Sequence, residues 1–350
     1  MDIGNKIKQL RMKMGLTQEH LATRLGISAQ SVSKWENSVT MPDITLLPVL
    51  SSELGVSIDE LFDMTADQKL HRIEKRLDVE EEFSQETFRE YEDFLKNQLE
   101  GGEDLARRYG LLARLYHHRA TADLRRVSRY AREAICKDPA KKECQWLLQK
   151  ADGAYVWDWN VSHHTAVIDF YKRLIESDPV AAVTNIPYYE LMDNLIADHR
   201  TEEAKRYLSV YQTLSGYQPF LIPVYHAYIA LAEYHAEEAD AVMEEALKDY
   251  SGHSGFLFEM AQYCARRCQY EKAIGYYERS WASDEKLPRY TDTLHAISII
   301  YEILGQYEKA IETYERMLVC LTQEWHYQRD DAVMIETKRE ISRLQSLRSK

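Results

Sequence analysis

The sequence predicts an all-α protein in which a small N-terminal domain of five short helices precedes an array of repeated helical pairs. Two observations support this prediction. Helix caps and helix-stop glycines follow one another closely in the first 65 residues. Further along, "YEKAIGYYER" at Tyr270 returns 37 residues later as "YEKAIETYER" at Tyr307, and a period of this length is typical of helical solenoids.

The composition indicates a soluble chain that is long enough for two or three domains. Of its 350 residues, 45% are hydrophobic and 29% are charged. No apolar run approaches the roughly 20 residues that span a bilayer, and Lys and Arg interrupt the N-terminal segment, unlike a secretory signal. Five cysteines, scattered from Cys136 to Cys320, do not suggest a disulfide framework. We therefore predict a cytoplasmic protein with no membrane partner.

The first domain, residues 1–65, contains signals for five helices. Gly15 and Gly26 are suited to ending the first and second helices, whereas Thr17 and Ser28 are suited to capping the second and third. "MPDITLLPVLSSELG" would form the fourth helix and "SIDELF" the fifth. Pro48 lies inside the fourth helix, and it is tolerated there only in a first turn or at a kink.

The second and third helices are joined by the short segment "GIS", which is the arrangement of a helix-turn-helix. If Val32 and Trp35 of the third helix face the core, a helical period places four residues on its solvent side. These residues are Ala29, Gln30, Ser33 and Lys34. Gln pairs with adenine, Lys with guanine, and Ala contacts the thymine methyl group. We predict that this face contacts the bases of double-stranded DNA.

The segment "TQEHLATRLGISAQSVSKWEN…PDITLLPVLSSELGVSIDELF" resembles the Xre/Cro-type, lambda-repressor-like DNA-binding domain over nearly all of residues 3–63. The resemblance assigns base contacts to the same four positions and phosphate contacts to Gln18 and Asn37. It also implies a structural salt bridge between Arg11 and Glu36, and binding as a homodimer to two-fold sites. Where the family often has Gly, this chain has a serine, at position 38.

The charge of the chain is distributed unevenly, although its net value is −13. Residues 1–38 hold six Lys and Arg against three acids, whereas residues 39–65 hold five acids and no Lys or Arg. One face of the first domain can therefore be basic. The alternative is a helix-turn-helix that no longer binds DNA and serves as a packing or dimerisation unit. The intact polar face favours DNA binding over this alternative.

Residues 66–104 form a charged connector between the two predicted domains. Its apolar residues keep approximate helical spacing, so we predict helix rather than disorder, with a break at Gly101-Gly102. A coiled-coil contact between two copies is left open, because the pattern is too short to decide.

Residues 105–350 are predicted to form a helical-repeat domain. Four alanines mark its period, at spacings of 35, 34 and 37 residues, and they are Ala204, Ala239, Ala273 and Ala310. The array resembles the tetratricopeptide repeat family, and the pairs Asp138-Pro139 and Asp178-Pro179 resemble its repeat-ending turns. Such an α-solenoid presents a concave surface to peptides or partner proteins and could also dimerise.

Most of the 24 tyrosines are expected to pack between the repeats. Three polar residues are the candidates for lining a groove that holds an extended peptide: Asn194, Arg266 and Arg267. A DNA-binding domain joined to such repeats resembles, in architecture, the peptide-responsive quorum-sensing regulators of Gram-positive bacteria. The resemblance implies a short peptide as ligand.

The sequence offers no sign of catalysis, cofactor or metal binding. It lacks the GxxxxGK[ST], GxGxxG, GxSxG and HExxH motifs. Cys264, Cys268 and His253 lack the spacing of a structural zinc site. We predict a dimeric, sequence-specific transcriptional regulator, modulated by a peptide or protein, and not an enzyme. The alternative is a protein-interaction scaffold whose helix-turn-helix does not read DNA.

Overall fold

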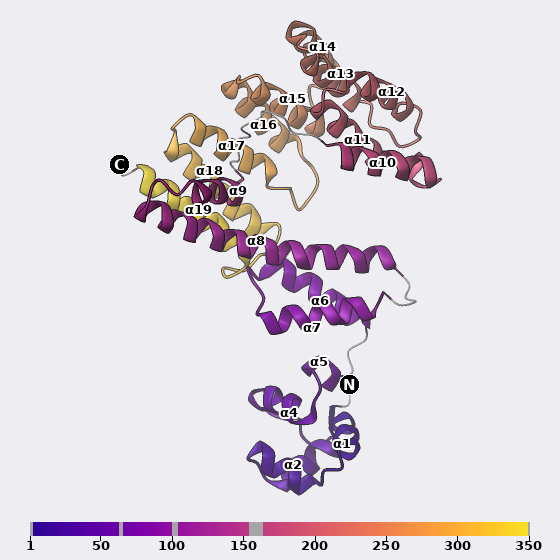
Figure 1. Cartoon of the computed structure of the whole chain (residues 1–350), viewed down its shortest axis with the longest axis vertical. Coiled ribbons are helices and arrows are strands. Elements are labelled where there is room, and N and C mark those ends of the chain that lie inside the picture. Colours follow the sequence, from indigo (N-terminus) through magenta and orange to yellow (C-terminus); the bar gives the residue numbers. More distant parts are fainter. Residues whose placement is uncertain (1–2, 63–65, 100–103, 154–163, 349–350) are drawn as a thin grey trace. The chain divides into compact units, whose positions relative to one another are not determined.

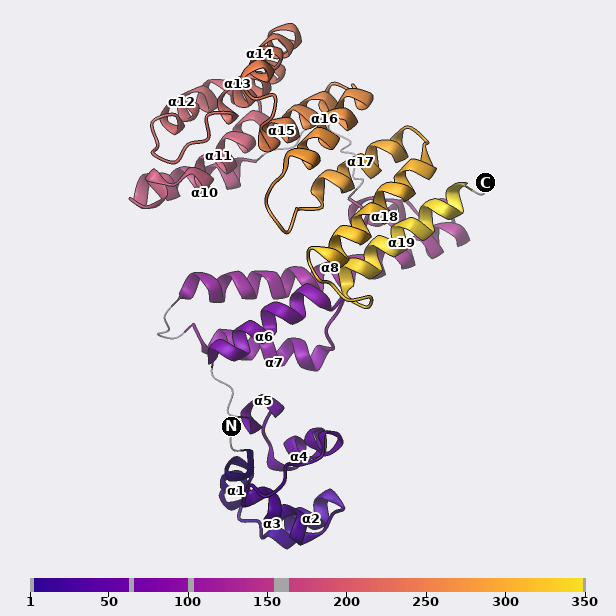
Figure 2. The same ribbon diagram turned by 180° about the vertical axis from the view of Figure 1, so that it is seen from behind.

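The computed structural model describes four stretches of the chain, which are residues 3–62, 66–99, 104–153 and 164–348. Every regular element in these stretches is a helix, so the predicted all-α fold class is confirmed. The chain divides into two compact units, Met1–Ala122 and Asp123–Lys350. Figures 1 and 2 show the helices from opposite sides.

Within residues 3–62 the helices follow the predicted order. They are α1 (Ile3–Lys13), α2 (Gln18–Leu25), α3 (Ala29–Glu36), the short 3-10 helix η1 (Ile44–Leu46), α4 (Leu47–Leu54) and α5 (Ile58–Leu61). Both predicted caps are present, because the Thr17 side chain accepts a hydrogen bond from the His20 N–H and that of Ser28 from the Ser31 N–H. Gly26 ends α2 with a left-handed φ of 68°.

The fourth helix is shorter than the sequence predicted. Its N-terminal part is η1, which is capped by the Asp43 side chain through a 2.8 Å hydrogen bond from the Thr45 N–H. Pro48 lies in the first turn of α4, where its missing N–H leaves no helical hydrogen bond unmade. The proline therefore fits the helix without a kink.

Helices α1 and α3 approach each other closely at a glycine. A Cβ atom at Gly4 would lie 1.9 Å from the carbonyl oxygen of Trp35, so only glycine fits there. Val32 is fully buried and Trp35 is 5% exposed, as their predicted core positions require. The backbone of α3 thus rests directly on α1, with its other face turned outward.

The connector contains two helices, α6 (Ala66–Val79) and α7 (Gln85–Asn97). Their apolar residues share one hydrophobic cluster with the first part of α8 (Leu105–Lys137), where Leu95 and Leu115 are fully buried. The helical prediction for this segment is therefore confirmed. Gly101-Gly102, the predicted break, lies outside the described residues, and the boundary at residue 104 stays a prediction.

Four helical pairs follow one another from residue 185 to 323. In order they are α11 (Asn185–Ala197) with α12 (Thr201–Tyr211), α13 (Leu221–Ala232) with α14 (Ala236–Asp249), α15 (Ser254–Arg266) with α16 (Tyr270–Ser283), and α17 (Asp292–Ile303) with α18 (Tyr307–Gln323). The four period-marking alanines all lie on second helices and are fully buried: Ala204, Ala239, Ala273 and Ala310. A methyl group at these points lets the paired helices pack closely, as predicted.

The described helices that flank the four pairs are less regular. Before them come α9 (Lys142–Ala151), α10 (Thr165–Ser177) and the short η2 (Ala181–Val183), and after them α19 (Ala332–Arg348), which packs on α18. The two Asp-Pro pairs come directly after α8 and α10. Since α8 has 33 residues, it is much longer than any helix of the four pairs. The resemblance of the two Asp-Pro pairs to repeat-ending turns implies two further repeat units in this upstream region, and these units stay a prediction.

Candidate functional site

Helix α3 (Figure 2) contains the four residues that the sequence singled out for base contact, and none of them is fully buried. Gln30 and Lys34 are exposed and lie four residues apart, so they share one face of the helix. Ser33 and Ala29 are half-buried, and Ala29 packs partly against the core of the domain. Gln30 and Lys34 are therefore the more exposed of the four candidates.

The C-terminal end of α3 is held by Asn37, one of the two predicted phosphate contacts. Its side-chain amide donates a hydrogen bond to the carbonyl oxygen of Ser33 at 2.9 Å, and the residue is exposed. The next residue, Ser38, has a φ of 57°, a left-handed conformation that favours glycine. The position at which the family often has glycine is thus one whose backbone conformation glycine adopts more easily than serine.

One carboxylate joins the first three helices. Arg11 of α1 donates to both carboxylate oxygens of Glu36 in α3, at 2.5 and 2.9 Å. The side-chain amide of Gln18, at the start of α2, donates to the same carboxylate at 2.8 Å. Because an amide nitrogen has two hydrogens, the bond to Glu36 uses only one of the two N–H donors of the Gln18 side chain.

Glu36 is ionised in spite of its burial. It is only 4% exposed, and burial alone would raise its pKa. The hydrogen bonds from Arg11 and Gln18 outweigh burial, however, and hold the pKa of Glu36 below its ordinary value. This ion pair, between the two residues that the family resemblance joined, fixes α1 and α3 together.

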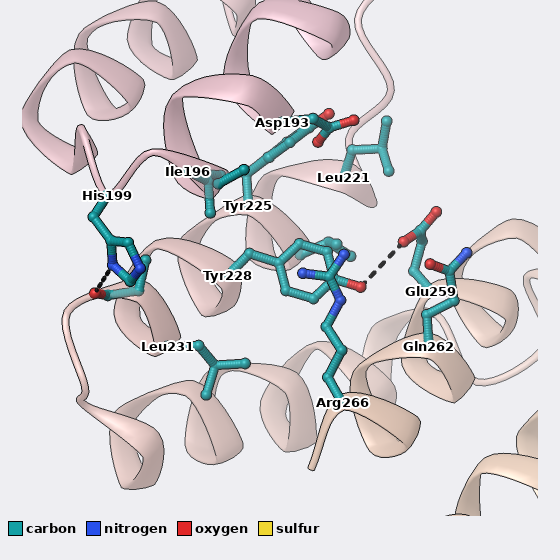
Figure 3. A pocket seen from close by; sticks show the side chains of 13 residues that line it. Asp193, Ile196, His199, Leu221, Tyr225, Tyr228, Leu231, Glu259, Gln262 and Arg266 are labelled. Carbon is teal, nitrogen blue, oxygen red and sulfur yellow. Dashed lines mark hydrogen bonds between the residues drawn. The ribbon is translucent and has the colours of Figure 1, made fainter. Parts of the chain in front are cut away.

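A second candidate site lies in the repeats, where three successive first helices line a cavity of about 560 Å³. Helix α11 contributes Asp193, Ile196 and Ala197, with His199 just beyond it; α13 contributes Leu221, Val224, Tyr225, Tyr228, Leu231 and Ala232; α15 contributes Glu259, Gln262 and Arg266. Figure 3 shows these side chains around the cavity. The volume is within the range of roughly 300 to 1,000 Å³ that ligand sites occupy.

Two carboxylates and one guanidinium give the cavity its charge. The Tyr228 hydroxyl donates a 3.5 Å hydrogen bond to Glu259, and the Arg266 guanidinium lies 4.4 Å from the centroid of the Tyr228 ring. Loss of hydration raises the pKa of Asp193 to about 6 and that of Glu259 to about 7. Asp193 is exposed and Glu259 is half-buried, so loss of hydration is the better supported cause at Glu259. The negative charge of Asp193 adds to the rise at Glu259.

Of the three residues predicted to line a groove, the cavity contains Arg266 only. Asn194 points elsewhere, because its amide oxygen lies 2.7 Å from Nδ1 of His164. Arg267 forms an ion pair with Asp240, 3.1 Å between nitrogen and oxygen. Ligand contact by Asn194, Arg266 and Arg267 stays a prediction.

Sequence reasoning missed the carboxylates Asp193 and Glu259. A usable signal was present in the repeat spacing. Glu259, Gln262 and Arg266 of α15 occupy the same positions in their repeat as Tyr225, Tyr228 and Ala232 occupy in the repeat of α13. Among the described residues, no group of three or more His, Cys, Asp or Glu could hold a metal ion. Nor does any described helix combine the length and apolarity of a membrane span.

Two helices joined by a tight turn, with the second presenting a polar outer face, define a helix-turn-helix DNA-binding protein. The helix-turn-helix family profile matches residues 7–61. HTH-type transcriptional regulator YopO of Bacillus subtilis is 36% identical over 61 residues, which are 17% of this chain and 87% of YopO. The chain belongs to the family of helix-turn-helix transcriptional regulators, which is not a family of enzymes.

The HTH-type transcriptional activator BcrR of Enterococcus faecalis is 41% identical over 61 residues, 17% of this chain. The match covers only 30% of BcrR. The matches to BcrR and YopO thus each cover only 17% of this chain.

Two solved structures align over most of the chain. PlcR of Bacillus thuringiensis, in complex with the peptide PapR7 and DNA, is 14% identical, with 99% of this chain and 95% of that one covered and a TM-score of 0.19. Apo ComR of Streptococcus vestibularis is 15% identical, with 98% of each chain covered and a TM-score of 0.24. TM-scores this low support no conclusion about this chain.

Proposed function

We propose that this chain is a sequence-specific transcriptional regulator that binds a two-fold operator in double-stranded DNA as a homodimer. A peptide or protein ligand on the repeat domain would modulate its activity. The observation that best supports DNA reading is the outward polar face of α3, whose opposite face is locked into the core by Val32 and Trp35. A helix held in this way can enter the major groove with its side chains pointing at the bases.

Each residue of the α3 face has a chemical role in the proposal. Gln30 would pair with adenine and Lys34 with guanine, since these side chains match the donor and acceptor patterns of the two bases. Ser33 would donate or accept a single hydrogen bond. Ala29 would contact a thymine methyl group, with the part of its side chain that is not packed on the core.

Two further residues would fix the register on the phosphate backbone. Gln18 lies in the first turn of α2, where free backbone N–H groups and the helix dipole favour an anion. Asn37 lies just beyond α3 and is exposed. Phosphate contacts of this kind position a protein on DNA without reading its sequence.

The test is selection of bound sequences from a random duplex pool by the full-length protein. The wild type is expected to enrich a two-fold-symmetric motif, and the double variant Gln30→Ala, Lys34→Ala to lose sequence preference. Lys13→Ala is the matched control, because it removes an exposed positive charge from the end of a different helix, α1. Equal enrichment by wild type and double variant would contradict the base-contact assignment.

The alternative function is a protein-interaction scaffold that does not read DNA. One observation favours it: the loop after α3 and the first residue of η1 expose three apolar side chains, Val39, Met41 and Ile44, at 67%, 65% and 79%. Exposed apolar groups that are close together often mark a contact with another protein. A scaffold should keep its partner binding in the Gln30→Ala, Lys34→Ala variant and should enrich no DNA motif in the selection.

A further inference from the structure

The repeat cavity contains more negative than positive charge. Asp193 and Glu259 both point into it, and Arg266 is the one Lys or Arg among its lining residues (Figure 3). Over the described part of the chain, neither carboxylate has a Lys, Arg or His within ion-pair distance. Their hydrogen bonds come from tyrosine hydroxyls instead, Tyr225 for Asp193 and Tyr228 for Glu259. An additional cation would therefore balance the cavity.

The wall of the cavity is also suited to a cation. Tyr225 and Tyr228 are buried on α13, and the ring of Tyr228 already has the Arg266 guanidinium 4.4 Å from its centroid. A cation over an aromatic face is attracted by the electrons of the ring, most strongly where water is excluded. Arg266 itself is exposed at the end of α15, so its side chain can move aside.

The two carboxylates of the cavity, Asp193 and Glu259, lower the stability of the fold when they are ionised. Loss of hydration favours the neutral forms of both carboxylates and outweighs the opposing effect of the Arg266 charge, so both pKa values are raised. Asn and Gln would fill the same space without that cost. Strained electrostatics in a cavity is the pattern of a site kept for binding rather than for packing.

We propose that the cavity binds a Lys or Arg side chain of a peptide, held between Asp193 and Glu259 and against the rings of Tyr225 and Tyr228. The proposal rests on the proposed function, in which the repeats accept a peptide or protein. A peptide suits the site better than a free amine, because apolar side chains flank the charged centre. Leu221, Ile196 and Leu231 lie around it in Figure 3, and they offer contacts to apolar residues on either side of the basic one.

The test uses the full-length protein and short synthetic peptide libraries that are acetylated and amidated at their ends, so that no terminal charge contributes. The central residue is fixed as Arg, Lys, norleucine or Glu, and the other positions are random. The wild type is expected to retain the Arg and Lys libraries about tenfold more than the norleucine library, and the Glu library least. In the Asp193→Asn, Glu259→Gln variant this preference should disappear, with retention of the norleucine library unchanged.

Glu190→Gln is the control, because this exposed carboxylate lies one turn before Asn194, raises the pKa of Asp193 through its charge, and does not line the cavity. It should keep the preference for basic residues. The unfolding temperature of the double variant should be at least that of the wild type, which shows that the fold is intact.

The outcomes separate this inference from the proposed function. Retention of peptides without preference for a basic residue, or a preference that survives in the double variant, would overturn the inference and leave peptide binding in place. No retention of any library would overturn both the inference and the role of a peptide as ligand. A third outcome is that no peptide library is retained, whereas spermidine binds to the wild type and not to the double variant. This result would indicate a free amine as ligand and would also overturn the proposal.

Discussion

Two glutamates, Glu36 in the DNA-binding domain and Glu259 in the repeats, have opposite electrostatic surroundings. Glu36 is 4% exposed and accepts hydrogen bonds from Arg11 and Gln18, so its pKa is lowered. Glu259 is half-buried and accepts one from Tyr228, and its pKa is raised to about 7. Burial disfavours both charges, and the difference lies in the partners. A carboxylate paired with a guanidinium indicates a structural role, whereas one that lines a cavity without an ion-pair partner indicates a binding role.

The largest effect is expected from removing the partner of Glu36. Arg11→Met leaves an uncompensated carboxylate in the core, and we expect the free energy of unfolding of the N-terminal domain to fall by about 3 kcal/mol. Denaturant titration of the full-length protein, followed by a probe on α1, measures this loss.

The double variant Arg11→Met, Glu36→Gln is the control, and it should recover part of the loss because no buried charge is left. A single variant as stable as the wild type would show that the ion pair does not hold the first three helices together.

A second contrast between the regions concerns two glycines inside helices. Gly4→Ala places a Cβ atom 1.9 Å from the Trp35 carbonyl oxygen, so α1 must shift away from α3. We expect a loss of about 2 kcal/mol and weaker DNA binding. Gly275→Ala in α16 is the matched control, because nothing lies within 4 Å of its Cβ position, and alanine there should stabilise the helix by about 0.5 to 1 kcal/mol.

Urea unfolding and a DNA-binding assay measure both variants. Equal effects of the two substitutions would contradict the close contact between α1 and α3.

The smallest expected change in stability is that of the Glu259→Gln variant, and it can be recognised by its dependence on pH. A raised folded pKa means that the Glu259 carboxyl favours folding below its unfolded pKa, near 4.5, and that this contribution is lost as the pH rises to about 7. Glu259→Gln should therefore stabilise the repeats by about 1 kcal/mol at pH 8, after allowance for screening by water, and by nothing below pH 4.5.

Thermal unfolding of wild type and variant across this pH range checks the sign. Glu36→Gln should behave in the opposite way, with its largest loss of stability at neutral pH, because the folded pKa of Glu36 is lowered. A Glu259→Gln variant that is less stable than the wild type at pH 8 would show that the charge of Glu259 does not oppose folding.

The sequence predicted the fold well because its signals are local. Thr17 and Ser28 each cap a helix start with their own side chain, and Gly26 ends a helix through its own backbone. A buried alanine such as Ala273 marks a close helix contact wherever the repeat returns. The exposed face of α3 could be predicted for the same reason, because the buried Val32 determines which residues of this helix point outward.

The cavity could not be predicted in this way. Its residues come from α11, α13 and α15, and their meeting depends on how each first helix is rotated. Successive residues on a helix point about 100° apart, so choosing Asn194 instead of Asp193 moves the prediction from the cavity to a contact with His164. Short-range patterns do not encode that rotation.

The single carboxylate shared by α1, α2 and α3 has a consequence for the entropy of recognition. Since Arg11, Gln18 and Glu36 connect the three helices through short hydrogen bonds, the reading helix is preorganised before it meets DNA. Little conformational freedom is then left to lose on binding, which favours affinity. In the proposed regulator, a ligand on the repeats would leave the shape of α3 unchanged and would act by altering the spacing between two such rigid domains.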